Sequence, residues 1–153
     1  MEELVSCRDF LPNLLSPKNM IIYLDIDGVL TYDSLEKFGQ AANGAMEFLR
    51  AITNKYDCYW LTTHCRGGEN HATEHLSKKL PAEALPYLNL IKPTDWSTWK
   101  TEAIDFSHDF RWIEDGVYGP ELEALRKHNC EDKLIKINLR EKPDQLKDIL
   151  SQL

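Results

Sequence analysis

The chain has 153 residues, a length that suits one domain with a single continuous core. Its hydrophobic share of 42% and charged share of 28% exclude wholesale disorder, a collagen-like repeat and a coiled coil. The 18 basic and 25 acidic residues give a net charge of −7. We expect no general nucleic-acid binding, because such binding depends on lysine and arginine neutralising phosphates.

Targeting and redox signals favour a cytoplasmic location. No apolar run approaches the roughly 20 residues needed to cross a bilayer, so we expect no membrane association. The apolar stretch 10–15 is broken by Pro12 and Asn13 and makes a poor signal peptide. The four cysteines form no CxxC pair and no zinc-ribbon spacing, which predicts reduced thiols.

The hydrophobic pattern predicts alternating strands and helices. The continuous apolar run Met20–Leu24 indicates a strand buried on both faces, and the spacing from Ala45 to Ile52 indicates an amphipathic helix. Further strands are predicted at 56–61, 88–91, 110–113 and 134–139, with 88–91 the weaker pattern, and further helices from Gly119-Pro120 and from Pro143 onward. This alternation implies βαβ units, a parallel sheet and one α/β domain over residues 1–153.

Polar residues collect where these strands end, which is where open parallel sheets bind ligands. The first strand runs into Asp25 and Asp27, whose side chains point the same way in an extended chain. Two carboxylates this close repel each other unless a cation or a shared proton compensates, so a divalent metal is expected. Gly28 permits a sharp turn that would bring backbone N–H groups towards an anion. The alternative is an Asp-rich turn without a ligand.

The run YLDIDGVLT resembles the first signature of the haloacid dehalogenase (HAD) superfamily, and the resemblance continues in order along the chain. The next predicted strand ends at Thr62 in WLTTHCRG, Lys100 lies in TWKTEAI ahead of a further strand, and that strand ends in Glu114-Asp115. The resemblance implies a HAD-like Rossmannoid fold, a three-layer doubly wound parallel sheet. It also implies a Mg²⁺-dependent phosphomonoester hydrolase that works through an aspartyl-phosphate intermediate.

The resemblance also implies a role for each residue. Asp25 would be the nucleophile and Asp27 the general acid and base, with its main-chain carbonyl contacting the metal. Thr62 would donate hydrogen bonds to the phosphoryl group, and Lys100 would neutralise charge on Asp25 and the phosphate. Asp25, Asp27 and Asp115 would hold Mg²⁺, with Glu114 as a supporting or alternative ligand.

Several assignments remain open on the sequence. Thr63 is an alternative to Thr62, and Lys92 is an alternative to Lys100. Arg66 lies in a Gly-Gly loop and is a candidate contact for a second phosphate or a substrate carboxylate.

Aromatic and histidine residues leave further alternatives. Trp60 and Trp112 are predicted in the core, whereas Trp96 and Trp99 are candidates for the substrate entrance. His71 and His75 would share one helix face and favour either a solvated pair or a zinc site.

The segments between the motifs leave no room for a large cap domain. Uncapped relatives typically act on macromolecular substrates, so the expected partner is a phosphorylated substrate, small or macromolecular. The alternative function is a HAD-like binding or regulatory module that has lost its catalytic activity.

Overall fold

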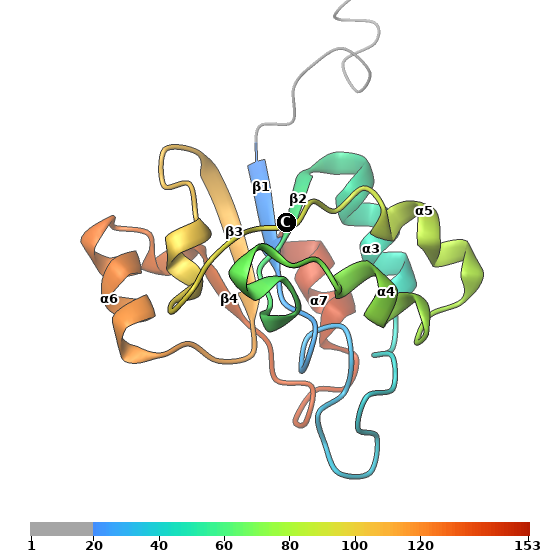
Figure 1. Ribbon diagram of the computed structural model, residues 1–153. Helices are drawn as coiled ribbons and strands as arrows, with labels where there is room; N and C mark the ends of the chain where they lie inside the picture. Colours follow the sequence, from blue (N-terminus) through green and yellow to red (C-terminus); the bar gives the residue numbers. More distant parts are fainter. Residues whose placement is uncertain (1–19) are drawn as a thin grey trace, which may run out of the picture.

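The apolar runs of the sequence form a four-stranded sheet in the computed structural model, which describes residues 20–153 (Figure 1). The strands are β1 (Met20–Leu24), β2 (Asp57–Trp60), β3 (Asp109–Glu114) and β4 (Leu134–Lys136). The helices are α3 (Ala45–Lys55), α4 (Ala72–Ser77), α5 (Leu85–Leu88), α6 (Gly119–Lys127) and α7 (Gln145–Gln152). The stretch 10–15 and Cys7, used above for targeting and redox predictions, lie outside the described residues.

The order of the strands creates a natural binding position. All neighbours are parallel and the order is β2-β1-β3-β4. From β1 the chain passes to β2 on one side and then returns to β3 on the other side. The topological switch point therefore lies between the carboxyl ends of β1 and β3, where ligands of open α/β sheets bind. A hydrogen bond from Asp25 N–H to the Ile113 carbonyl (3.3 Å) joins the two strands there.

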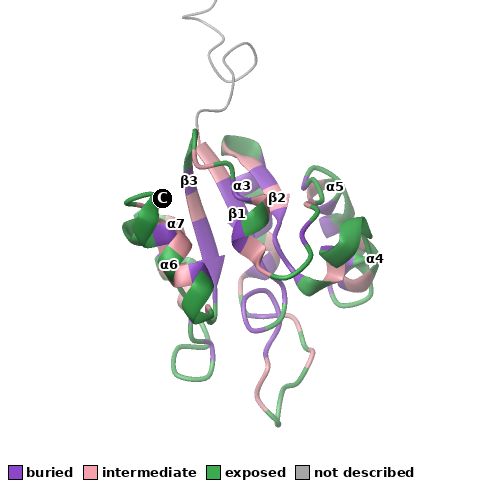
Figure 2. Cartoon of the chain, turned by 60° about the vertical axis from the view of Figure 1, so that its left-hand side comes forward, coloured by how far each residue is buried: buried purple, intermediate pink, exposed green. Residues whose placement is uncertain are grey.

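The sheet is buried on both faces because its side chains alternate between two apolar clusters (Figure 2). Ile22, Leu24 and Trp60 belong to one cluster, with apolar residues of α3, α4, α5 and α7. Tyr23 and Trp112 belong to the other, which includes Leu125 of α6. The prediction that Trp60 and Trp112 pack in the core is confirmed, since both are fully buried.

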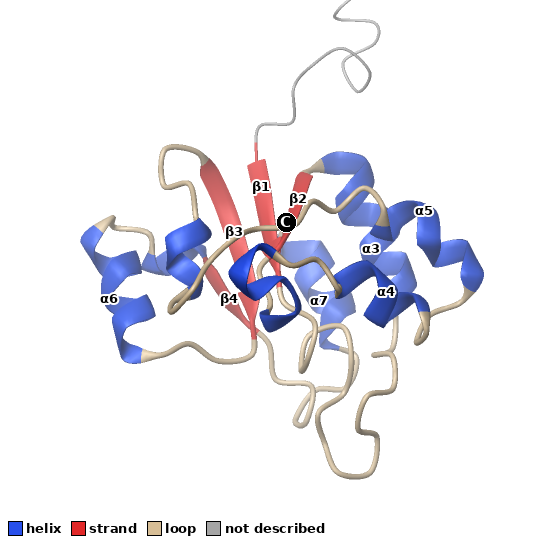
Figure 3. Ribbon diagram, in the orientation of Figure 1, coloured by secondary structure: helices blue, strands red, loops and turns tan. Residues whose placement is uncertain are grey.

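Helices on both sides of a parallel sheet confirm the predicted α/β class and its three layers (Figure 3). The predicted strands at 56–61 and 134–139 are shorter in the structure, where they become β2 and β4. Ile137 and Leu139 continue beyond β4 as buried residues, and the Ile137 N–H still donates a hydrogen bond to the Glu114 carbonyl of β3 (3.0 Å). Their burial, rather than an extended sheet, accounts for the apolar pattern there.

The strand predicted at 88–91 is wrong. Leu88 ends α5, and the chain turns through Leu90 before Lys92 makes an isolated bridge with Tyr59. Leu88 and Ile91 are both buried in the cluster that contains α3. The short run 88–91, apolar except for Asn89, fits a strand or one helical turn equally well, and tertiary packing selected the turn.

Loops and short helices make up the segments that connect the strands. The stretch from Gly28 to Gly44 is a loop with a bridge between Thr31 and Ala41, and the stretch from β2 to β3 contains α4, α5 and loops. Among residues 20–153 these segments contain no insertion of domain size. Over the same residues, every helix is too short or too polar to traverse a lipid bilayer.

Candidate functional site

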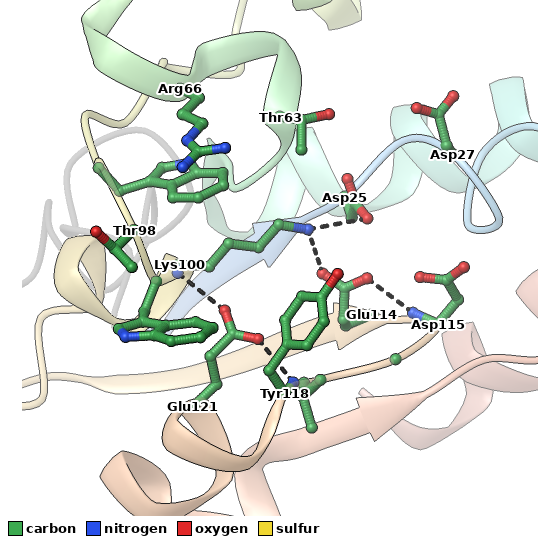
Figure 4. A pocket seen from close by; sticks show the side chains of 14 residues that line it. Asp25, Asp27, Thr63, Arg66, Thr98, Lys100, Glu114, Asp115, Tyr118 and Glu121 are labelled. Carbon is green, nitrogen blue, oxygen red and sulfur yellow. Dashed lines mark hydrogen bonds and ion pairs between the residues drawn. The ribbon is translucent and has the colours of Figure 1, made fainter.

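A pocket of about 820 Å³ lies at the carboxyl ends of β1 and β3, at the switch point of the sheet (Figure 4). The residues that the sequence predicted for the site and that line this pocket are Asp25, Asp27, Thr63, Arg66, Lys100, Glu114 and Asp115. They come from four separate segments of the chain. The fold therefore brings together nearly all the predicted site residues in one cavity.

Lys100 lies between two buried carboxylates at the base of the pocket. Its Nζ is 3.1 Å from Asp25 Oδ2 and 2.6 Å from Glu114 Oε2 (Figure 4). Burial alone would lower the pKa of Lys100, but the two carboxylates outweigh burial and raise this pKa above its usual value. Burial and the charge of Asp25 raise the pKa of Glu114. Lys100 is thus a fixed cation beside Asp25, whereas Lys92 lies apart and contacts Asp57.

The two residues of the acidic pair at the end of β3, Glu114 and Asp115, lie in different environments. Glu114 is buried, and its Oε1 accepts a hydrogen bond from Asp115 N–H while its Oε2 binds Lys100. Asp115 is exposed and reaches the turn at Gly28. A Cβ atom at Gly28 would lie 2.3 Å from Asp115 Oδ2, and Gly28 has φ +78°, so glycine is required there. The Gly28 N–H donates to the Thr31 carbonyl (2.9 Å) and closes the turn instead of facing an anion.

Two glutamates that sequence reasoning missed hold the lysine in place. Glu121 is buried at the start of α6, and its carboxylate accepts hydrogen bonds from Lys100 N–H and Tyr118 N–H, each at 2.9 Å. Glu102 accepts hydrogen bonds from three consecutive backbone N–H groups, 97–99, which lowers its pKa to about 2. Each lies three residues after the residue that precedes a helix, a position where glutamate often binds back to the backbone. That spacing is the signal that could have found them.

The two threonines after β2 differ in position. Thr63 is exposed and lines the pocket, whereas Thr62 is fully buried and its hydroxyl accepts a hydrogen bond from His64 N–H (3.4 Å). The Thr62 carbonyl accepts a hydrogen bond from Trp96 Nε1 (3.2 Å). Thr63 therefore lies with the other predicted residues in the pocket lining, whereas Thr62 is buried behind that lining.

One wall of the pocket is aromatic and basic. The Arg66 guanidinium lies 5.3 Å from the centre of the Trp96 ring, and its Nε donates to the Ser97 carbonyl (2.6 Å). Trp99 lies 5.8 Å from the Tyr118 ring across the pocket. As the sequence suggested, Trp96 and Trp99 both line the cavity. This wall can hold a flat or anionic group of a ligand.

Asp27 turns away from the acidic cluster and towards two histidines. Its Oδ2 is 3.1 Å from His64 Nε2, and its Oδ1 is 3.9 Å from His75 Nε2. The two imidazole rings are stacked, with centroids 4.2 Å apart. Burial and the neighbouring His64 lower the pKa of His75. His71 contacts Glu69 instead (2.5 Å), so the two histidines of the suggested zinc pair bind different carboxylates.

Two groups of side chains among residues 20–153 have the spacing of metal ligands. Asp25, Glu114 and Asp115 offer oxygens, and Asp27, His64 and His75 offer one oxygen and two nitrogens, within 4.8 Å of one another in each group. Hard cations such as Mg²⁺ prefer the first kind of ligand set. Imidazole nitrogens favour zinc and similar metals.

Searches of protein-family models, of curated proteins and of solved structures each return no match to this chain.

Proposed function

We propose that this chain is a Mg²⁺-dependent phosphomonoester hydrolase of the HAD type that acts through an aspartyl-phosphate intermediate. The observation that carries the proposal is the contact of Lys100 Nζ with Asp25 Oδ2 (3.1 Å) beside the acidic cluster at the switch point. A carboxylate whose repulsion is offset by a fixed ammonium group is what attack on an anionic phosphorus requires.

The order of the motifs supports the HAD-like assignment. The DxDG run follows β1, the threonines follow β2, Lys100 precedes β3, and the acidic pair ends and follows β3. Segments this far apart in sequence converge on one pocket because the strands are parallel and because β2 and β3 are added on opposite sides of β1.

In the first half-reaction, an Asp25 oxygen forms a bond to phosphorus as the bond from phosphorus to the substrate oxygen breaks. Asp27, in its acid form, gives a proton to that leaving oxygen, a step worth about 10²–10⁴-fold for a well-placed acid. Lys100 offsets charge on Asp25 and on the phosphoryl oxygens. Thr63 donates its hydroxyl to one of those oxygens.

In the second half-reaction, Asp27 accepts a proton from water as that water attacks phosphorus and frees the Asp25 carboxylate. The hydrogen bond to His64 Nε2 (3.1 Å) holds the exposed Asp27 side chain in one orientation. His64 is therefore a positioning residue for Asp27.

The acidic cluster fits Mg²⁺. Asp25, Glu114 and Asp115 gather three carboxyl groups against the one ammonium group of Lys100, and an additional cation relieves the remaining repulsion. Both Glu114 oxygens already accept hydrogen bonds within the protein, so Asp25 and Asp115 would be the direct ligands while Glu114 orients Lys100. When bound there, Mg²⁺ supplies positive charge that stabilises the phosphoryl group in the transition state.

The substrate is a phosphomonoester on a large molecule. The described segments beside the pocket are loops and short helices, and exposed Tyr118 lies at the rim. A macromolecular substrate would itself exclude water from such an uncovered cavity. A panel of phosphorylated metabolites, phosphopeptides and phosphorylated oligonucleotides tests this class.

The decisive experiment measures hydrolysis of p-nitrophenyl phosphate with Mg²⁺, with and without EDTA, for the wild type, Asp25→Asn and Asp57→Asn. Asp57 is a matched control because it is an aspartate that pairs with Lys92 away from the pocket. We expect EDTA to abolish turnover and Asp25→Asn to lower it by about 10⁶-fold, as when other nucleophiles are removed. Beryllium fluoride, a phosphoryl mimic, should bind the wild type with Mg²⁺ and not Asp25→Asn.

Near-normal turnover in Asp25→Asn would refute the covalent mechanism. A folded wild type that hydrolyses none of the substrates in the panel would instead favour a binding module that kept the fold and lost the chemistry.

A further inference from the structure

A second group of possible metal ligands lies beside the pocket and takes no part in the acidic cluster. His64 follows β2 in the 3₁₀ segment Thr63–Gly68, and His75 lies on α4. A hydrogen bond from His71 N–H to the His64 carbonyl (3.0 Å) ties the two segments together. This bond holds the start of α4 against the segment that carries His64, and the His64 and His75 rings are stacked with centroids 4.2 Å apart.

The distances in this group match those of a metal site. Ligand atoms placed tetrahedrally at about 2.0–2.1 Å from zinc lie about 3.3 Å from one another. His64 Nε2 and His75 Nε2 lie 3.1 Å and 3.9 Å from the two oxygens of Asp27. The ligand atoms of the three residues lie within 4.8 Å of one another, so a side-chain adjustment of up to about 1.5 Å would bring them to the spacing that one ion requires.

We propose that Asp27, His64 and His75 form a second metal site that binds Zn²⁺ or a similar borderline divalent cation. Three protein ligands with a remaining position for water is a common zinc arrangement. The two nitrogen ligands favour zinc over Mg²⁺, so the two clusters select different metals by ligand type. The side chains of His64 and His75 are 22% and 32% exposed, which leaves a path for the ion to enter.

Zinc at this site inhibits the hydrolase. This consequence rests on the proposed function, because it follows from the role of Asp27 as acid and base. A carboxylate that coordinates zinc cannot carry a proton to the leaving oxygen or accept one from water. His75 lies outside the pocket lining and 3.9 Å from Asp27 Oδ1, beyond hydrogen-bond distance, whereas His64 makes the hydrogen bond that orients Asp27, so His75 is the ligand to substitute with the least effect on catalysis.

Binding is tested without any assay of activity. Isothermal titration with Zn²⁺ in saturating Mg²⁺, together with the visible absorption of bound Co²⁺, compares the full-length wild type with His75→Asn, His64→Gln and His71→Asn. We expect each of the first two variants to bind zinc at least about 100-fold more weakly than the wild type, since even partners outside the ligand shell cost 10–100-fold. His71→Asn is the matched control, and its affinity should equal that of the wild type.

Inhibition is tested with p-nitrophenyl phosphate in saturating Mg²⁺. We expect zinc to inhibit the wild type and His71→Asn at the same concentration, and His75→Asn only at about 100-fold higher concentration with its basal turnover retained. Equal zinc affinity in the wild type, His64→Gln and His75→Asn would overturn the site. Zinc that binds as expected without slowing hydrolysis would overturn the inhibitory role. A chain that hydrolyses no phosphomonoester overturns the proposed function and with it the inhibition, whereas the zinc site is decided by the titration.

Discussion

The two aspartates of the DxDG run share a strand end and have different environments. Asp25 is buried, and its neighbours are Lys100, Glu114 and Asp115. Asp27, with 58% of its side chain exposed, faces His64. The two residues are two positions apart and both line the pocket, but Asp27 lies beside His64 at the turn that Gly28 permits.

This difference suits two roles that one environment could not support. A nucleophile must stay ionised, and a neighbouring fixed ammonium group favours that state. A general acid and base must exchange its proton with the substrate and water, which requires exposure. We therefore predict that substitutions near Asp25 and substitutions near Asp27 differ in their effects on turnover, Mg²⁺ affinity and stability.

After Asp25→Asn, the largest effect is expected from Asp27→Asn. Removing the acid and base should lower turnover of p-nitrophenyl phosphate by about 10²–10⁴-fold while leaving Mg²⁺ affinity unchanged. Asp115→Asn, on the other side, should weaken Mg²⁺ binding measured by isothermal titration. If Asp27→Asn weakens Mg²⁺ binding as much as Asp115→Asn does, Asp27 and the acidic cluster do not have the separate roles proposed for them.

Lys100→Met tests the buried side. The substitution leaves the Asp25 and Glu114 carboxyl groups buried without their cation, so we expect the free energy of unfolding to fall by about 3–5 kcal/mol in EDTA. Added Mg²⁺ should restore part of that loss. Urea unfolding measures both, and Lys78→Met is the control because its pair with Glu74 is exposed. A loss no larger than that of Lys78→Met would contradict the arrangement.

The threonines give a comparison within one dipeptide. Thr63→Val removes a hydroxyl from the pocket and should lower kcat by about 10²-fold, the usual cost of a donor to the transition state. Thr62→Val removes a buried hydroxyl that only accepts a bond from His64 N–H, so kcat should change little. Steady-state kinetics with saturating Mg²⁺ distinguish them, and a larger loss in Thr62→Val would return the phosphate contact to Thr62.

The smallest effect is expected from Glu102→Gln. Because the folded protein lowers the pKa of Glu102 to about 2 from 4.5, its carboxylate stabilises the fold above about pH 4.5 and loses that contribution as pH falls towards 2. Thermal unfolding should therefore show a gap in Tm between the wild type and the variant that is constant near neutrality and narrows in acid. A gap that widens in acid would exclude this carboxylate as the cause.

The sequence by itself determined most of the elements and most of the residues that line the candidate site. The buried run before Asp25 and the apolar face of 45–52 identify β1 and α3, because burial on two faces or on one face leaves a visible pattern. Three short motifs at strand ends and a fourth around Lys100, ahead of β3, identify seven of the pocket residues, since the carboxyl ends of parallel strands share one edge.

Only the tertiary structure decided the rest. The sequence could not choose between Thr62 and Thr63, because one residue reverses the direction of a side chain and the register depends on the neighbouring strands. Nor could it pair His75 with Asp27, since that contact joins α4 to the turn after β1 across 48 positions of the chain. Contacts between distant segments depend on how the helices pack on the sheet, and local patterns carry no record of that packing.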